Sequence, residues 1–401
     1  MITSSETIRA SGKQKRRRLL TIALTAAVAA GAIGFVALKW GQNGPYAYRH
    51  QVQLWPNPDP IDGSGLNQIY PIEFSPDGRV AMAKDNRDRI LILDPSTGQI
   101  TRIVSGGGDN LVDSLAFAKD GRSIVSAGAI GQVNARDVAT GDLLRTFRLS
   151  EKTPVVEHSG NVTATTYPCS EVLISQNGNK VVCKDNDKKL LEIWNVETGR
   201  LDVALTGNAE QNVLAFSPAG NVLALADLSH KVSLRRIPSP ANRPLFDAAP
   251  GSPVHACFSP DETILATGCG REIELWATSS GSRLRTFSLG KRAPPDADIT
   301  SLAFSLDGTT LAVGAEWRVD TWRNALLGKS ELWRESRGCV ALWNVASGTP
   351  IGAVYPKSDV SKIALSPAAD CLAVGSWEGT MTLWQRSRRS SEQEPIGPTS
   401  N

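Results

Sequence analysis

Phe74-Ser-Pro-Asp-Gly78 is the first copy of a five-residue motif that recurs along the chain. Its proline presets the φ angle of a turn, its aspartate tolerates the bend, and its glycine accepts a positive φ. Short apolar runs flank the copies, as 301–304 and 310–313 flank the sixth, and this arrangement predicts a β-hairpin around each turn. The other copies begin at Phe117, Ile174, Phe216, Phe258, Phe304 and Leu365.

The stretch after each hairpin predicts two more strands. A third apolar run often ends in tryptophan, as in 191–194 and 273–276, and a glycine-containing turn such as Thr198-Gly199 follows it. A fourth run completes the unit, for example 284–287. The copies begin 42 to 61 residues apart, and a period of roughly 40–45 residues is that of a propeller blade with four strands. We therefore expect an all-β, seven-bladed β-propeller of four-stranded antiparallel blades.

These motifs resemble those of the WD-repeat β-propellers over about residues 50–386. The resemblance rests on the hydrophobic-Ser-Pro-Asp-Gly turn, the strand that ends in tryptophan and the Thr-Gly turn after it. It implies the fold, which serves many functions. Typical members also form a buried network from a Gly-His pair and an aspartate six residues before the tryptophan. In four blades of this chain that aspartate position holds Lys188, Gly270, Arg337 and Glu378. We therefore expect packing between blades to replace the network.

The seventh repeat lacks a fourth strand, because the segment 385–391 is rich in arginine and serine. A strand-like segment with no blade of its own, about 49–55, precedes the first copy. We expect this segment to supply the missing strand and close the ring, which leaves only short, protected strand edges.

The beginning of the chain predicts a membrane anchor. Residues 1–18 hold six basic side chains and one acidic side chain. Residues 19–38 carry no charge and, at about 1.5 Å per residue, span roughly 30 Å, the thickness of the hydrocarbon core. The positive-inside bias predicts a cytoplasmic N-terminus and a propeller on the extracytoplasmic side. The alternative is a cleaved signal peptide and a secreted propeller.

Five parts make up the predicted organisation. They are a basic cytoplasmic head at 1–18, a transmembrane anchor at 19–40, a juxtamembrane segment at 41–60 that includes the closing strand, seven repeats at 61–386, and a disordered tail at 387–401. The predicted fold class is thus an all-β propeller preceded by one transmembrane helix. The longer connection at 149–168 is interpreted as a polar surface loop.

Charge and motif content exclude several classes of function. Outside the basic head the chain has 37 basic and 39 acidic residues, a balance that lacks the clustered cations of a nucleic-acid-binding surface. We predict no catalytic, cofactor-binding or metal site and identify no small-molecule substrate, since no nucleophile with a base, phosphate loop or zinc spacing occurs. The aspartates of 85–88 and 185–187 are interpreted as solvated turns, because a calcium loop needs more oxygen ligands.

The six cysteines are interpreted as free, buried thiols. A two-residue turn at Asn177-Gly178 pairs Cys183 with Val172 and not with Cys169, although export of the propeller would allow disulfides. Cys257 and His255 lie two residues apart on one strand and share a face. We interpret them as a core thiol and a histidine at the end of a loop.

The sixth repeat carries an insertion at 316–336 between its second and third strands, and it holds three of the ten tryptophans. Val319, Trp322, Leu326 and Trp333 share a face if the insertion is helical, while a long hairpin is the alternative. Tryptophan and arginine are enriched in interface hot spots, so the insertion either folds back onto its own propeller or binds a protein partner. The candidate partner-binding residues are Trp317, Arg318, Trp322, Arg323, Trp333 and Arg334.

These features together predict a membrane-anchored WD-repeat propeller that acts as a non-catalytic protein-interaction platform. One alternative is a ligand-binding or enzymatic propeller that uses its central channel. A cluster of carboxylates or histidines at the channel mouth would favour it. The other alternative is an accessory or sensor part of a membrane signalling system.

Overall fold

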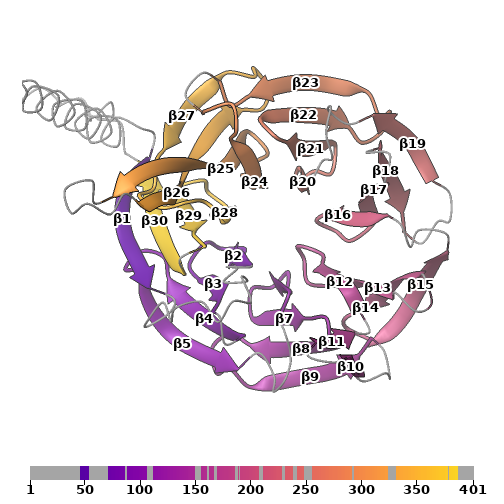
Figure 1. The fold of residues 1–401 in the computed structure, drawn as a ribbon. Coiled ribbons are helices and arrows are strands. Elements are labelled where there is room, and N and C mark those ends of the chain that lie inside the picture. The colour runs from indigo at the N-terminus through magenta and orange to yellow at the C-terminus, as the bar shows by residue number, and fades with distance from the viewer. Residues whose placement is uncertain are drawn as a thin grey trace, which may run out of the picture.

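Seven antiparallel sheets stand around a common axis and form a closed ring (Figure 1). Each sheet is one blade, and its first strand is innermost. The all-β, seven-bladed propeller predicted from the repeats is therefore confirmed. The structure, a computed structural model, describes residues 46–386 apart from 54–70, 86–87, 106–111, 150–154, 160–161, 167–168, 186–187, 189, 207–210, 228–230, 238–241, 248–254, 291–292, 324–330 and 378.

Blades 1 to 3 are built from consecutive strands. Blade 1 contains β2 (Ile72–Phe74), β3 (Ala81–Lys84), β4 (Arg89–Asp94) and β5 (Gln99–Ser105). Blade 2 contains β6 (Ser114–Phe117), β7 (Ser123–Ala127), β8 (Gln132–Asp137) and β9 (Leu143–Arg148). Blade 3 contains β12 (Cys169–Ile174), β13 (Lys180–Asp185), β14 (Leu190–Asn195) and β15 (Arg200–Thr206).

Blades 4 to 6 follow the same order. Blade 4 contains β16 (Asn212–Phe216), β17 (Val222–Ala226), β18 (Lys231–Arg236) and β19 (Asn242–Asp247). Blade 5 contains β20 (His255–Phe258), β21 (Ile264–Cys269), β22 (Glu272–Ala277) and β23 (Arg283–Ser288). Blade 6 contains β24 (Asp298–Phe304), β25 (Thr310–Arg323), β26 (Glu331–Asn344) and β27 (Pro350–Val354).

Blade 7 joins the two ends of the described chain. Its inner strands are β28 (Lys362–Leu365), β29 (Cys371–Gly375) and β30 (Thr380–Arg386), and its outer strand is β1 (Tyr46–Gln53). β1 pairs antiparallel with β30, from Tyr46 opposite Arg386 to Gln53 opposite Thr380. The first strand of the chain therefore closes the ring, as predicted, and it begins at Tyr46, a little earlier than the expected 49–55.

The connection between blades 2 and 3 differs from its prediction. Within 149–168, β10 (Val155–Ser159) and β11 (Val162–Thr166) pair antiparallel as a separate two-stranded sheet. The interpretation of this segment as a surface loop is thus wrong in part. Its threonine- and valine-rich runs are good strand formers, although they are too short for the sequence to distinguish them from a loop.

The hydrophobic core lies between the blades. Seven clusters of buried described residues each join two neighbouring blades, including blades 7 and 1. Aromatic rings add to this packing, since Phe287 of blade 5 stacks on Trp343 of blade 6 with ring centroids 5.1 Å apart. Burial of apolar area stabilises a fold by about 25 cal/mol per Å². The clusters of buried apolar residues in the described chain thus lie between neighbouring blades.

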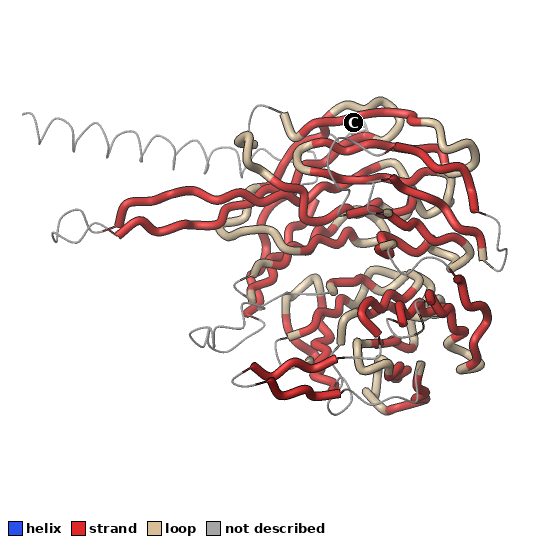
Figure 2. The backbone as a smooth tube through the Cα atoms, turned by 45° about the vertical axis from the view of Figure 1, so that its right-hand side comes forward, coloured by secondary structure: helices blue, strands red, loops and turns tan. Residues whose placement is uncertain are grey.

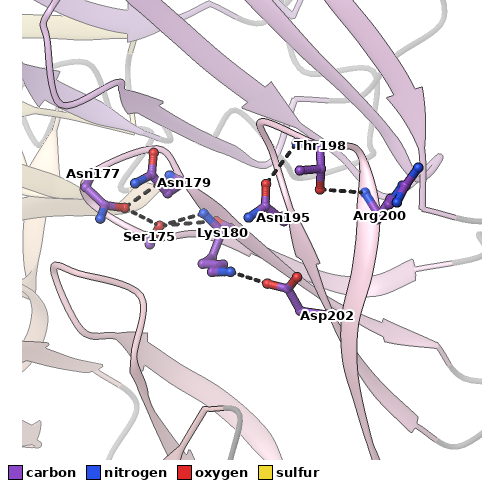
Figure 3. Close-up of polar contacts among 8 residues, drawn as sticks. All are labelled: Ser175, Asn177, Asn179, Lys180, Asn195, Thr198, Arg200 and Asp202. Atoms are coloured by element: carbon purple, nitrogen blue, oxygen red, sulfur yellow. Dashed lines mark hydrogen bonds and ion pairs between the residues drawn. The ribbon is translucent and has the colours of Figure 1, made fainter.

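The recurrent turn motif is held by a buried serine, shown for blade 3 in Figure 3. Ser175 is fully buried, and its hydroxyl donates to the side chain of Asn177 at 2.8 Å. The same hydroxyl accepts the backbone N–H of Lys180 at 3.0 Å, the first residue of β13. One side chain therefore closes the hairpin at the point where the second strand begins.

Five other blades repeat this arrangement, with a buried serine accepting a backbone N–H at the start of the second strand. Only in blade 2 does alanine, Ala118, take the serine's place. The equivalent serines are Ser75, Ser217, Ser259, Ser305 and Ser366. In these six blades the motif thus specifies one end of the blade by a local interaction that does not need the rest of the ring.

Replacement of such a serine tests its contribution to stability. In Ser305→Ala the partly buried N–H of Thr310 loses its partner at 3.0 Å, and the side chain of Asp307 loses its partner at 2.5 Å. Because an unsatisfied buried donor costs about 1–3 kcal/mol, we expect urea unfolding to show a loss in that range. Ser96→Ala, which removes an exposed serine–aspartate hydrogen bond, should cost about 0.5 kcal/mol or less. Equal losses for the two variants would contradict the account.

A disulfide joins Cys169 and Cys183, so the prediction of free thiols is wrong for this pair. Cys183 does pair with Val172, as the turn predicts. A β-bulge between Cys169 and Glu171, however, sets Cys169 opposite Asp185. The extra residue of a bulge shifts the alternation of faces, so Cys169 comes onto the face of Cys183. The remaining cysteines are free thiols: Cys257, Cys269, Cys339 and Cys371.

Two aspartates interpreted as parts of solvated turns are buried. Asp85 is 0% exposed and Asp185 is 3% exposed. Asp85 accepts the backbone N–H of Arg89 at 2.9 Å, and its other oxygen lies 2.6 Å from the Arg89 guanidinium. Asp185 makes the corresponding contacts with Lys188 at 2.9 and 3.1 Å. These carboxylates hold the turns between second and third strands, because backbone donors and cations take the place of water.

The predicted head, anchor and tail, at 1–18, 19–40 and 387–401, lie outside the described residues. Within the part of the chain that the structure describes, no helix is long and apolar enough to span a bilayer.

Candidate functional site

The insertion of blade 6 is a long β-hairpin. β25 and β26 pair continuously from Thr310 opposite Asn344 to Arg323 opposite Glu331, and the hairpin extends beyond the other strands of the ring (Figure 2). The hairpin alternative of the sequence analysis is thus confirmed and the helical alternative is wrong. Consecutive strand residues alternate between two faces, so Val319 and Trp322 do not share the face that a helix would give them.

Neighbouring strands cover only the base of this hairpin. β24 reaches as far as Glu316, which pairs with Asp298, and β27 pairs no further along β26 than Val340, opposite Val354. Among the described strands, 317–323 and 331–337 therefore pair only with each other. This outer part is a two-stranded ribbon, and no other described strand pairs with its outer edges.

Two contacts fix the base of the hairpin to blade 7. The indole N–H of Trp377 donates to the Glu316 carboxylate at 2.6 Å, and partial burial raises the pKa of that carboxyl above its usual value. Gly338 lies against the segment before β28, where an added Cβ would approach the Val360 nitrogen to 2.7 Å. The base is thus held rigidly, and the ribbon projects from a defined position.

The register of the ribbon places residues of opposite charge at facing positions, Asp320 opposite Arg334 and Arg323 opposite Glu331.

The structure brings the six predicted partner-binding residues onto this one ribbon. Trp317 is half-buried and Arg318 is exposed near the base. The other four lie on the outer part of β25 and β26, where Trp322 pairs with Leu332 and Thr321 with Trp333. Trp317 pairs with Arg337, an exposed residue that the sequence analysis did not single out as a candidate site residue.

Gly338 offers a test of the rigid base. In Gly338→Ala the new methyl group meets backbone atoms, the Val360 nitrogen and the Ala315 oxygen at 2.9 Å, which cannot move as a flexible side chain can. Overpacking of this kind costs typically about 1–3 kcal/mol, so the thermal midpoint should fall by several degrees. Ser336→Ala, two residues away and exposed, is the matched control and should leave the midpoint unchanged. An unchanged midpoint in both variants would show that the contact is not tight.

A second group of side chains gathers around the ring axis. The innermost strands β2, β20 and β28 (Figure 1) carry Glu73, His255, Cys257 and Lys362, all half-buried. Lys362 interacts electrostatically with Glu73 on one side and with Cys257 and His255 on the other. The sequence analysis noted the shared face of His255 and Cys257 but missed Glu73 and Lys362, because nothing in the local sequence relates residues of different blades.

Burial controls the charges of this group. It raises the pKa of Glu73 to about 7 and that of the Cys257 thiol to about 12, and it lowers the pKa of Lys362 below its usual value. It also lowers the pKa of His255 to about 4, with a contribution from Lys362. At neutral pH Cys257 and His255 are therefore uncharged. A protonated thiol is a weak nucleophile, so the group is better suited to binding than to nucleophilic catalysis.

A known family model matches one part of the chain. Residues 348–385 match the family model described as "WD domain, G-beta repeat". The matched segment contains β27 of blade 6 and β28 to β30 of blade 7, so the sequence repeat is offset from the blade by one strand. No curated protein matches the chain.

Proposed function

We propose that this WD40-repeat, seven-bladed β-propeller is a non-catalytic platform for protein partners, held at a membrane by residues 19–40 and displayed on its extracytoplasmic side. The contact with the partner is made by the ribbon of β25 and β26. A WD40-type propeller is a rigid scaffold that is commonly used for protein interaction. The partner that such a scaffold binds is determined by the loops and insertions on its surface.

The proposal rests mainly on the geometry and composition of the ribbon. It is anchored by the Glu316–Trp377 hydrogen bond, its outer edges pair with no other described strand, and its sequence is rich in tryptophan and arginine. Free strand edges give affinity through main-chain hydrogen bonds, and alternate side chains give specificity. Since blade 6 is closed without this extension, the extra residues are not needed to complete the ring.

The membrane part of the proposal is supported by the sequence and by the position of β1. The uncharged stretch 19–38 follows a basic head, and the first described strand begins at Tyr46. The residues between, 39–45, span at most about 25 Å when fully extended. A retained anchor would therefore keep the closing blade close to the bilayer surface.

The disulfide of blade 3 supports the extracytoplasmic side. Disulfides persist in oxidising compartments and are rare in the cytosol. If intact cells are denatured in acid and alkylated without reduction, we expect Cys169 and Cys183 to escape alkylation until a reductant is added. Cys257 and Cys339, which are free thiols, serve as internal controls and should be alkylated directly. Complete alkylation of all four without reduction would place the propeller in a reducing compartment.

Partner capture tests the role of the ribbon. The bait is the full-length chain, crosslinked in membranes and analysed by mass spectrometry after detergent extraction. In the test variant, 319–335 is replaced by Asn-Gly, which favours a two-residue hairpin turn and keeps Glu316 and Gly338. We expect the amount of a specific partner recovered with this variant to be at least tenfold lower than with the unmodified chain.

The control for capture is Leu306→Ser. Leu306 is 54% exposed and lies in the turn at the opposite end of β25, so the variant removes exposed apolar surface without touching the ribbon. It should retain the partner at the level of the unmodified chain. Equal recovery of the same proteins with all three baits would contradict a binding role for the ribbon.

A further inference from the structure

The outermost strands of three neighbouring blades follow one another along the rim of the propeller (Figure 1). They are β1 of blade 7, β5 of blade 1 and β9 of blade 2. His50 Nε2 on β1 donates to the Ser96 carbonyl at 3.0 Å, in the turn before β5. The guanidinium of Arg102 on β5 donates to the Thr140 carbonyl at 2.9 Å, in the turn before β9. Hydrogen bonds thus join each of these outer strands to the next blade and fix their relative positions.

This part of the rim is apolar and basic. The described chain has nine exposed large hydrophobic side chains, and five of them lie on these three strands: Tyr48, Ile100, Ile103, Leu143 and Leu144. Four exposed arginines lie on the same strands: Arg49, Arg102, Arg145 and Arg148. Exposed apolar side chains that occur singly are normal on a protein surface, whereas a group of them marks a contact with a protein or a membrane.

Acidic residues are confined to the turns beside this part of the rim. The three strands contain no aspartate or glutamate. Asp94 and Asp137 each accept a backbone N–H of their own turn at 2.8 Å, and Asp142 is exposed directly before β9. The strands themselves therefore present positive charge, with the negative charges gathered at one end.

The place where the described chain begins favours a bilayer as the partner of this rim. β1 is the first described strand, and residues 39–45, which separate it from the uncharged stretch 19–38, span at most about 25 Å when extended. The basic and apolar strands start at β1 and continue through blades 1 and 2. In blade 6, on the other side of β1, the outer strand β27 contains no basic residue.

We propose that the rim formed by β1, β5 and β9 rests on the surface of an anionic bilayer. The arginines pair with lipid phosphates, and the exposed tyrosine, isoleucine and leucine side chains enter the boundary between headgroups and acyl chains. This inference rests on the anchor of the proposed function and adds a second contact to it. A propeller that stands on its rim keeps its ring axis along the bilayer plane, so the loops at both ends of the blades stay accessible to partners.

Photocrosslinking to lipid tests the rim contact. One full-length chain carries a photoreactive residue in place of Leu144, which is 60% exposed on β9, and a second carries it in place of Leu284, which is 50% exposed on β23 of blade 5. Both are reconstituted into vesicles of phosphatidylcholine and phosphatidylglycerol in equal amounts. We expect mass spectrometry to detect at least about tenfold more lipid adduct at position 144, because only the rim enters the headgroup region.

Two equally exposed side chains provide matched substitutions in the chain labelled at position 144. Ile103 on β5 is 51% exposed and Leu284 is 50% exposed. Ile103→Glu should lower the lipid adduct by about threefold or more, because it removes apolar surface and adds a charge that anionic lipid repels. Leu284→Glu should leave it unchanged, as should folding measured by circular dichroism in both variants. Equal adducts from the two variants would overturn the proposal.

Extraction with alkaline carbonate separates a failure of the rim contact from a failure of the anchor. Release of the chain from the vesicles would contradict the anchor and, with it, the rim contact that depends on it. A chain that resists extraction but gives no lipid adduct at position 144 would overturn the rim contact alone. Crosslinked dimers in place of lipid adducts would do the same and would assign this rim to a second copy of the chain.

Discussion

The pairing of β1 with β30 is the constraint on which the rest of the structure depends. A seven-bladed ring has no free end only if the last blade is completed by a strand from the other end of the chain. Tyr46 begins that strand and is 3% exposed. Its hydroxyl donates to the Ala369 carbonyl at 2.5 Å in the turn between β28 and β29, and burial raises its pKa to about 12. Tyr48 adds an edge-to-face contact with Trp384. Closure thus rests on specific side chains as well as on the β1–β30 ladder.

Local chemistry explains why the fold could be predicted from the sequence. In six of the seven blades the serine of the turn accepts a backbone N–H five residues on, as Ser259 does from Ile264. Each of these blades is therefore marked in the sequence by a short local motif. The closing strand could also be predicted, because a ring of seven such units leaves one strand missing. These inferences need only residues close together in the chain, or the count of strands.

Features that depend on register or on several blades could not be predicted. The bulge before Glu171 brings Cys169 onto the same face as Cys183, and no sequence signal marks this bulge. Glu316 and Trp377 are bonded across two blades. Glu73 and Lys362 come from blades at opposite ends of the repeat region, and only ring closure makes those blades neighbours. The candidate ribbon was found from its residue types, but its strand conformation was left open because the spacing of Val319, Trp322, Leu326 and Trp333 fits a helical face as well as a hairpin.

Two surfaces with different chemistry emerge from one ring. The ribbon of β25 and β26 projects from the rim of blade 6, and no other described strand pairs with its outer part; this geometry suits a protein partner. The channel group lies on the innermost strands, where burial raises the pKa of Glu73 and lowers the pKa of Lys362. Neither surface is required for closure of the propeller, so each can be altered while the scaffold is kept.

Site-specific photocrosslinking tests the central claim, that the ribbon is the contact surface of the platform, most directly. In one variant a photoreactive residue replaces Arg318, which is exposed near the base of the ribbon. In a separate control variant it replaces Arg79, which is exposed in the turn of blade 1 at the opposite end of the strands. The account predicts that Arg318, in intact membranes, yields a crosslinked product with one defined protein, and that Arg79 does not. Crosslinks to a defined protein from Arg79, with none from Arg318, would contradict it.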